Sequence, residues 1–410
     1  MEVYLARQPI FNRRKELYAY ELLFRSSMSG GFPGIDGDQA TSRILSSSFF
    51  TTGISKVSGG KPCFINFTQE LLLQGIPAML PRERVVVEVL EDVKATPEVV
   101  TACRELAGQG YIIALDDFVF SRDLLPLIEL AHIIKIDFRQ TPQAELKALL
   151  GLLPKNIKLL AEKIETYEEF GVARDLGFSY FQGYFFSRPE VLRHKDIAAS
   201  KLNLFNLLTA INRPEIDFKL IERMIAPDVS LAYKLLRYIN SAYYSRISEI
   251  KSVRQAVVYL GAQGTRQFVS LVAISALAAD KPDELIRTSI VRARLCELLA
   301  GCGGGRVDGA DLFLLGLFSL LDAMLDAPMA QLLESLPVAG EIKDALTRDQ
   351  GPYAAYLRAA VAYEQGQWLD CARNLEDLGI GQHEMINAYF DALTWAEHFT
   401  DGGTAEETDA

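Results

Sequence analysis

The sequence predicts an α/β plus all-α protein, in which a TIM-like (β/α) barrel with an antiparallel first strand is followed by an all-helical domain. The chain has 410 residues, of which 49% are hydrophobic, so it can build more than one core. Its first 190 residues alternate short strand-like runs with segments of helix length. From about residue 197, helical periodicity replaces the strand-like runs. We therefore expect a barrel over 1–196, a helical domain over 197–399 and a disordered acidic tail over 400–410.

Seven strand-like runs can be placed in the first half, and from the second onward they start about one strand, one helix and two loops apart, as in a (β/α) barrel. An eighth parallel strand is not evident. Residues 3–11 and the polar residues after them instead predict the first arm of a hairpin with 17–24, which would be antiparallel. The runs are 17–24, 63–67, 84–90, 111–115, 132–136, 157–161 and 180–184.

Two segments of the second half show helical periodicity most clearly. Residues 228–244 place Leu231, Leu235 and Ile239 four apart, on one face of a helix. Residues 283–300 begin after a proline and carry acidic residues in the first turn, where the helix dipole favours them. These patterns predict an all-helical second domain.

Composition excludes several classes of partner. The net charge of -11, without a cluster of Lys and Arg, argues against binding of double-stranded nucleic acid. The five cysteines are scattered and form no CxxC pair, which is typical of reduced thiols in the cytoplasm. No segment resembles a signal peptide, and the longest apolar runs fall short of the ~20 residues that a membrane span needs. We expect a soluble cytoplasmic protein that does not bind membranes.

Two adjacent aspartates, Asp116 and Asp117, follow the buried run 111–115, and two neighbouring carboxylates repel unless a positive group lies close. Carboxyl ends of parallel barrel strands meet at one mouth, and each of the other runs has a polar residue inside it or at its end. Any of these residues alone could be a hydrogen-bonded strand end, but together their oxygens suit Mg²⁺ or Mn²⁺. We therefore predict that a metal ion supplies the positive charge. The other polar residues are Glu21, Asn66, Glu88, Lys135, Glu162 and Gln182.

Seven motifs of the first half resemble, in order and spacing, those of EAL domains. They are "YELLFR" at 20–25, "INF" with Asn66, "VEVLED" with Glu88, "LDDF" at 115–118, "IKID" at 134–137, "AEKIET" at 161–166 and "FQGYFFSRP" at 181–189. EAL domains are metal-dependent phosphodiesterases that cut the bacterial messenger cyclic di-GMP to the linear dinucleotide pGpG. The resemblance, which covers about 1–190, implies that cyclic di-GMP is the ligand.

The resemblance also implies roles for individual residues. Asp117 is similar to the ligand of a second metal, and Lys135 to the lysine beside the catalytic water, where Glu88 and Glu162 also act. Gln182 resembles the glutamine that completes the site, while Gln8 and Arg25 resemble contacts to the guanine and phosphate of the ligand. The remaining metal ligands implied by the resemblance are Glu21, Asn66, Glu88, Asp116 and Glu162.

The second half resembles the HDOD domain over residues 239–268. HDOD domains are helical relatives of the HD phosphohydrolases that have lost the metal-binding His-Asp pair. None of the four histidines of this chain is followed by Asp, which agrees with that loss. The resemblance implies a signalling protein that contacts a protein partner through its helical domain.

The chain departs from the EAL pattern after the aspartate pair. EAL enzymes usually read DDFGTGYSS there, whereas this chain reads "DDFVFSRDLLPL". Val119 and Phe120 cannot adopt positive φ cheaply, so we expect Asp117 to be aimed differently and hydrolysis to be slow. Lys163 stands where the family has glycine and could meet the ligand's phosphates or reach solvent.

Two functions stay open at this point, beside a third case in which nucleotide binding is lost altogether. One is a metal-dependent phosphodiesterase, and the other is a catalytically silent cyclic di-GMP receptor that signals through the HDOD domain. The resemblance also implies a homodimer, although the altered loop is the segment that would form it.

Overall fold

The computed structural model describes residues 4–25, 57–190, 199–213, 252–303 and 307–400, together with a few single positions between 215 and 250. The chain divides into two compact units, Met1–Arg188 with Tyr363–Leu369, and Pro189–Ala362 with Asp370–Ala410. The predicted helix at 228–244 lies outside the described residues, apart from position 239. The predicted tail at 400–410 does so too, apart from Thr400, which ends the last helix.

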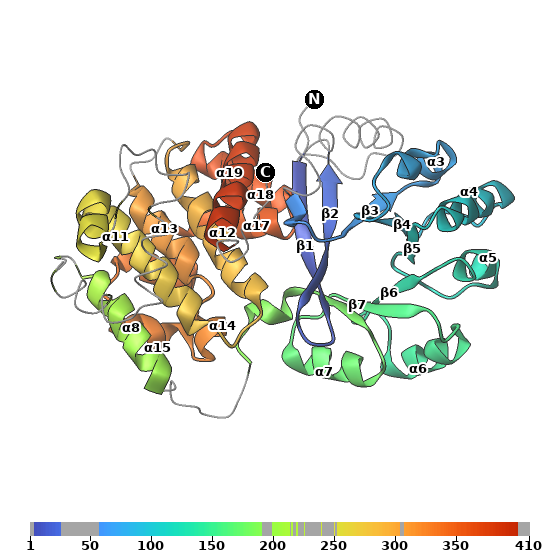
Figure 1. The fold of residues 1–410 in the computed structure, drawn as a ribbon, viewed down its shortest axis with the longest axis horizontal. Helices are drawn as coiled ribbons and strands as arrows, with labels where there is room; N and C mark the ends of the chain where they lie inside the picture. The colour runs from blue at the N-terminus through green and yellow to red at the C-terminus, as the bar shows by residue number, and fades with distance from the viewer. Residues whose placement is uncertain are drawn as a thin grey trace. The chain divides into compact units, whose positions relative to one another are not determined.

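The first unit contains a closed barrel of eight strands that neighbour one another in chain order (Figure 1). β1 runs antiparallel to both β2 and β8, and all other neighbours are parallel. This confirms the predicted fold class, and each of the seven predicted runs matches a strand to within two residues at either end. The strands are β1 (Tyr4–Asn12), β2 (Leu17–Arg25), β3 (Cys63–Phe67), β4 (Val85–Val89), β5 (Ile112–Leu115), β6 (Ile133–Asp137), β7 (Lys158–Glu162) and β8 (Tyr180–Gln182).

The eighth strand, which the sequence did not reveal, is the first arm of the predicted hairpin. β1 pairs with β2 along most of its length and also closes the barrel against β8, with Ile10 opposite Gln182. The pairing with β2 sets Gln8 opposite Glu21. An antiparallel strand therefore contributes to the same mouth as the seven parallel ones.

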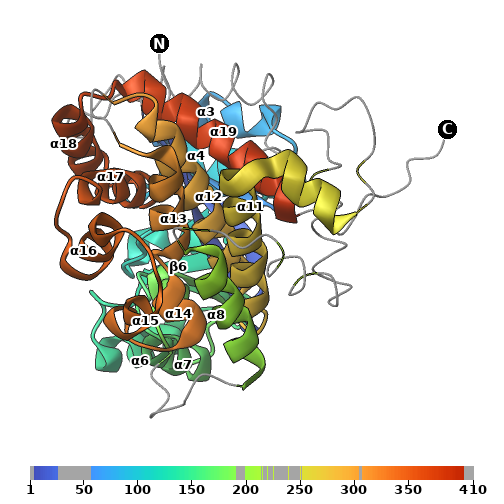
Figure 2. The same cartoon turned by 90° about the vertical axis from the view of Figure 1, so that its left-hand side faces the viewer.

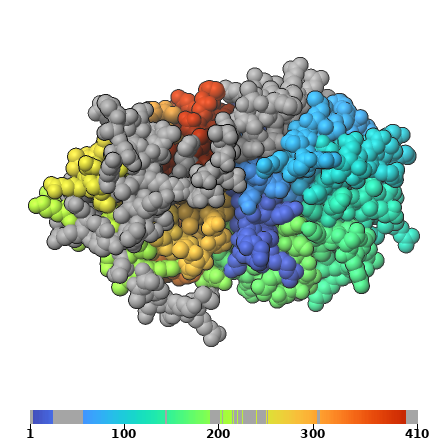
Figure 3. All heavy atoms as spheres, in the orientation of Figure 1, coloured from blue at the N-terminus to red at the C-terminus, as the bar shows by residue number. Residues whose placement is uncertain are grey.

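Helices cover the outside of the parallel strands (Figure 1). Three of them begin at a threonine whose side chain accepts the backbone N–H three residues later, namely Thr68, Thr96 and Thr166. In the space-filling view, side chains of this part of the chain, cyan to green, pack closely over the face shown (Figure 3). The helices are α3 (Gln69–Leu73), α4 (Pro97–Gly108), α5 (Leu125–Ile128), α6 (Gln143–Leu152) and α7 (Tyr167–Asp175), with short 3₁₀ turns at η1 (Ile76–Met79), η2 (Arg122–Leu124) and η3 (Tyr184–Ser187).

β8 ends two residues before the predicted run does. Gly183 has a φ of +142°, and a Cβ at this position would lie 2.0 Å from the carbonyl oxygen of Ile164. Only glycine fits so close a backbone approach, which breaks the strand and starts η3.

From Ala199 on, every described element is a helix, as the periodicity predicted. The helix predicted at 283–300 is α12 (Asp283–Ala300), which contacts α13 and α19 (Figure 2). Among the described residues, no helix is both long and apolar enough to cross a bilayer. The other helices are α8 (Ala199–Ile211), α11 (Val253–Leu277), α13 (Gly309–Phe318), α14 (Leu321–Leu325), α15 (Met329–Ser335), α16 (Gly340–Arg348), α17 (Ala354–Glu364), α18 (Trp368–Leu378) and α19 (Gln382–Thr400).

Candidate active site at the barrel mouth

The barrel interior holds one apolar layer to which each strand contributes a buried residue. Because side chains alternate along a strand, the residue two positions nearer the mouth faces the same interior. In every strand that residue is one of the polar residues predicted from the sequence. The layer consists of Ile10, Ala19, Phe64, Val86, Ala114, Ile133, Leu160 and Tyr180. The polar residues above it are Gln8, Glu21, Asn66, Glu88, Asp116, Lys135, Glu162 and Gln182.

The ammonium of Lys135 is the common partner of four carboxylates among these residues. Its Nζ is 3.1 Å from Glu21 Oε2, 2.8 Å from Asp116 Oδ1 and 2.8 Å from Glu162 Oε1, and it also donates to Glu88 Oε1. The side chain of Lys135 is only 1% exposed. We call its four partners, Glu21, Glu88, Asp116 and Glu162, the inner acidic group. An ammonium has three protons, so it cannot fully satisfy four carboxylates.

The inner acidic group carries more charge than one lysine can balance. Four ionised carboxylates and one ammonium sum to −4 + 1 = −3. Burial, with the negative charge of Glu21, raises the pKa of Glu88 well above its usual value despite Lys135. Burial raises the pKa of Glu162 to about 8, although Lys135 opposes this. The excess can be relieved by protons on these carboxyls or by a further cation.

Lys135 itself stays charged. Burial acts to lower its pKa, but the inner acidic group, with Glu162 the strongest contributor, holds that pKa well above the usual value. At Asp116, burial opposes ionisation, yet the ion pair with Lys135 leaves the carboxyl pKa lowered. The attraction between one ammonium and the surrounding carboxylates therefore helps to hold the site together.

Amide side chains orient Glu21 within the site. Gln182 Nε2 donates to Glu21 Oε2 at 2.8 Å and to Gln8 Oε1 at 3.0 Å, while Asn66 Nδ2 lies 3.3 Å from Glu21 Oε1. Gln8 Nε2 donates in turn to the carbonyl of Gln365, in a segment that belongs to the same compact unit as the barrel. Hydrogen bonds thus hold both glutamines in place. Gln8 lies on β1 and Gln182 on β8, and these two strands pair antiparallel.

Four buried oxygens of the site have no hydrogen-bond partner, and leaving such groups unpaired is costly. The described residues contain no group of three or more His, Cys, Asp or Glu side chains already arranged to hold a metal, and the ammonium of Lys135 lies among the four carboxylates of the inner acidic group. The unpaired oxygens are nevertheless the hard donors that Mg²⁺ and Mn²⁺ prefer, so the residues fit such an ion. These atoms are Asn66 Oδ1, Glu88 Oε2, Glu162 Oε2 and Gln182 Oε1.

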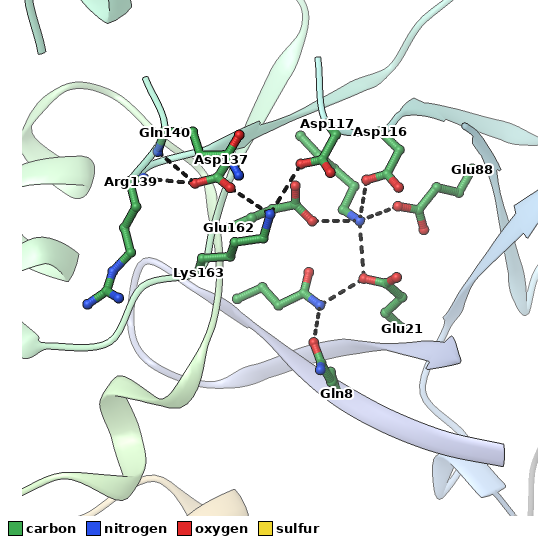
Figure 4. Close-up of polar contacts among 12 residues, drawn as sticks. Gln8, Glu21, Glu88, Asp116, Asp117, Asp137, Arg139, Gln140, Glu162 and Lys163 are labelled. Atoms are coloured by element: carbon green, nitrogen blue, oxygen red, sulfur yellow. Dashed lines mark hydrogen bonds and ion pairs between the residues drawn. The ribbon is translucent and has the colours of Figure 1, made fainter. Parts of the chain in front are cut away.

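The adjacent aspartates Asp116 and Asp117 contact different lysines. Asp116 pairs with Lys135, whereas Asp117 Oδ1 lies 3.6 Å from the Nζ of Lys163 (Figure 4). Asp117 has a φ of +36°, a conformation that aspartate tolerates better than most residues. Lys163 also donates to Asp137 Oδ2 at 2.6 Å. We call Asp117 and Asp137 the outer acidic pair.

The structure thus brings eight of the predicted residues into one cluster and places Asp117 at its edge. Arg25 is the last residue of β2, but its side chain lies outside the described residues. Sequence reasoning gave Asp137 no role, although it ends the quoted motif "IKID". It noted Lys163 only as a departure from the family glycine. Asp137 is a polar residue at the end of β6, and this position could have marked it as a candidate site residue.

Family comparisons match both units. A model of the EAL domain matches residues 54–189, and a model of the HDOD domain matches residues 201–332. A Vibrio cholerae protein named cyclic di-GMP phosphodiesterase CdgJ is 37% identical over 399 residues, which cover 96% of this chain and 92% of that protein. The Bacillus subtilis protein YuxH, named uncharacterized, is 34% identical over 412 residues, which cover 98% of this chain and all of that protein.

Solved structures resemble the barrel unit. The PaMucR phosphodiesterase in complex with c-di-GMP is 21% identical, with a TM-score of 0.39 over 46% of this chain and 97% of that chain. A standalone EAL protein from Vibrio cholerae O395 in its c-di-GMP bound form is 24% identical, with a TM-score of 0.37 over 46% of this chain and 92% of that one.

Proposed function

We propose that this chain, which belongs to the family of bacterial signalling proteins that join an EAL domain to an HDOD domain, binds and hydrolyses cyclic di-GMP at the mouth of its barrel. The relative named a cyclic di-GMP phosphodiesterase shares 37% of its residues over nearly the whole chain. The observation that carries the proposal is the buried cluster of carboxylate and amide oxygens, some of them unpaired, that surrounds the ammonium of Lys135 at the barrel mouth.

A divalent ion fits this cluster. Glu21, Asn66, Glu88, Asp116 and Glu162 would hold Mg²⁺ or Mn²⁺, and such an ion lowers the pKa of a bound water and polarises a phosphodiester. Gln8 and Arg25 would contact a guanine and a phosphate of the ligand, as the family resemblance implies. Gln182 holds Glu21 and Gln8 in place through its amide N–H groups.

The proposed reaction opens the ring once. Water adds across one phosphodiester, the phosphorus keeps the incoming oxygen as a 5′-phosphomonoester, and the 3′ oxygen leaves with a proton as a hydroxyl. The product is the linear dinucleotide pGpG. Lys135 keeps its positive charge among the inner acidic group throughout, so it serves as a fixed counter-charge near the reacting phosphate.

One observation favours a second function, that of a receptor which binds cyclic di-GMP without cleaving it. The loop after Asp117 lacks the family glycines. Under this alternative, ligand binding would be signalled to a protein partner through the HDOD domain. Under the enzyme proposal, the same feature makes hydrolysis slow compared with relatives that carry the glycine loop.

The test incubates the full chain with cyclic di-GMP and Mn²⁺ or Mg²⁺ and separates the nucleotides by chromatography. The proposal expects pGpG from the wild type and from Glu129→Gln, a matched change at an exposed glutamate. Glu88→Gln removes a carboxylate donor from the proposed metal site, so it should cut the rate steeply while the fold is retained. Turnover in excess EDTA would contradict the metal requirement, and binding without product would favour the receptor.

Location and assembly are part of the proposal. The described cysteines are all free, which agrees with a reducing cytoplasm. We propose a homodimer and a protein partner for the helical unit, as the EAL and HDOD resemblance implies. Light scattering of the purified chain with and without cyclic di-GMP measures its oligomeric state directly. A monomer under both conditions would contradict the homodimer.

A further inference from the structure

We infer that the ammonium of Lys163 takes the place of a second divalent ion beside Asp117, so that the barrel mouth of this protein holds one divalent ion and not two. The inference rests on that part of the proposed function in which the inner acidic group binds a metal. Lys163 supplies a permanent positive charge beside the outer acidic pair.

The close contact with buried Asp137 places the ammonium of Lys163, whose side chain is 49% exposed, beside Asp117. Its Nζ lies 2.6 Å from Asp137 Oδ2 and 3.6 Å from Asp117 Oδ1 (Figure 4). Asp137 is itself held, because its Oδ1 accepts the backbone N–H groups of Arg139 and Gln140 at 2.9 Å each. The side chain of Asp137 is 8% exposed, so its second oxygen needs a partner within the protein. Lys163 is that partner.

The backbone at both ends of the Lys163–Asp117 pair is unusual. Lys163 has a φ of +57° and Asp117 a φ of +36°, and only five described residues other than glycine have positive φ. Such conformations cost free energy in residues with a Cβ and persist where the surrounding structure enforces them. Two of the five therefore belong to one ion pair at the edge of the candidate site.

The inner acidic group and the outer acidic pair differ in how far their negative charge is balanced. All four unpaired oxygens of the site belong to the inner acidic group or to the two amides beside it, Asn66 and Gln182. A divalent ion on Asp117 would lie next to the Lys163 ammonium, and their repulsion would be twice that of two unit charges at the same distance. Moving Lys163 away would leave Asp137 buried without its cation. The outer acidic pair is therefore already neutralised in part, whereas the inner group is not.

The substitution that tests this is Lys163→Gly, which restores the residue that EAL domains carry at this place. Glycine adopts a φ of +57° without strain, so the fold should be retained. Lys163→Arg keeps the charge. Lys15→Gly is the matched control, because Lys15 also has a positive φ, +62°, but lies in the turn between β1 and β2.

The experiment counts Mn²⁺ ions bound to the full chain by electron paramagnetic resonance of free Mn²⁺, after EDTA treatment and dialysis, with circular dichroism to verify folding. The expected counts are one for the wild type, Lys163→Arg and Lys15→Gly, and two for Lys163→Gly. Adding Asp117→Asn to Lys163→Gly should return the count to one. A wild type that binds two ions, or a folded Lys163→Gly that binds only one, would overturn the inference.

The outcomes separate the inference from the proposed hydrolysis. Counts of one and two without any cleavage of cyclic di-GMP would support the role of Lys163 and overturn the phosphodiesterase. Cleavage of cyclic di-GMP by a wild type that binds two ions would support the phosphodiesterase and overturn the role of Lys163. Absence of bound Mn²⁺ from every variant would overturn both.

Discussion

Replacing Lys135 with Met should make the metal-free protein markedly less stable. The substitution keeps a side chain of similar length in the buried cavity but removes the charge that four carboxylates contact. Removing one partner of a buried ion pair costs about 3–5 kcal/mol. Glu162, whose pKa is raised to about 8, can take up a proton and relieve part of the repulsion. We therefore expect the lower end of that range, about 3 kcal/mol.

Thermal unfolding followed by circular dichroism in EDTA measures this loss. For a domain of this size, about 1 kcal/mol shifts Tm by roughly 2–4 °C, so the barrel transition should fall by about 6–12 °C. Lys61→Met, the same change at an exposed lysine before β3, should leave Tm almost unchanged. Mn²⁺ at about 100 times its Kd adds ~2.7 kcal/mol to any protein that binds it only when folded. It should stabilise Lys135→Met more than the wild type, because no ammonium competes for the carboxylates.

Three results would refute this reasoning. A Lys135→Met protein that melts in EDTA together with the wild type would show that the lysine is not the counter-charge of the site. Tm values that Mn²⁺ raises in neither protein would show that the inner acidic group does not bind the ion, and an equal rise in both would show that the ammonium does not compete with it.

Three further predictions concern the fold and its titration. Gly183→Ala would place a Cβ 2.0 Å from the carbonyl oxygen of Ile164, so urea unfolding should show a loss of at least about 3 kcal/mol. Gly316→Ala would place its Cβ 2.4 Å from the backbone of α12 and should lower the free energy of unfolding by about 1–3 kcal/mol. Gly340→Ala, which has nothing within 4 Å of its Cβ, should leave stability unchanged. Equal stabilities of the two variants would contradict the close packing at Gly316. Burial raises the pKa of Glu162 in the folded protein from 4.5 to about 8, so between these pH values the folded state binds a proton that the unfolded state has lost. The free energy of unfolding in EDTA should therefore fall as the pH rises from 4.5 to about 8. An increase in stability over this range would contradict the prediction.

The barrel was predictable because its strands are continuous apolar runs, which parallel strands buried on both faces require. The position of β1 as the eighth strand was not. Its pairing with β8, through Ile10 and Gln182, joins residues far apart in the sequence, and no local pattern reports such a contact. The end of β8 at Gln182 was missed for a similar reason, since the approach of Ile164 to Gly183 is a tertiary contact.

The site was predictable because strand ends in a barrel share one mouth, and because side chains alternate along a strand. The positive charge between Asp116 and Asp117 was expected to be a metal alone. The structure shows that each aspartate also contacts a lysine, Asp116 through Lys135 and Asp117 through Lys163. Both residues of the Asp117–Lys163 contact adopt positive φ, and the sequence does not encode that conformation in any simple motif.

The most direct test of the account is a ³¹P NMR time course of cyclic di-GMP with the full chain and Mg²⁺. The account predicts that the diester signal of the ring is replaced slowly by one diester and one phosphomonoester signal in equal amounts, as pGpG requires. It also predicts no change in EDTA or with Glu88→Gln, which alters the buried carboxylate beside Lys135. A spectrum that stays that of the intact ring with wild-type protein and Mg²⁺, or one that changes equally in EDTA, would contradict metal-dependent hydrolysis at the barrel mouth.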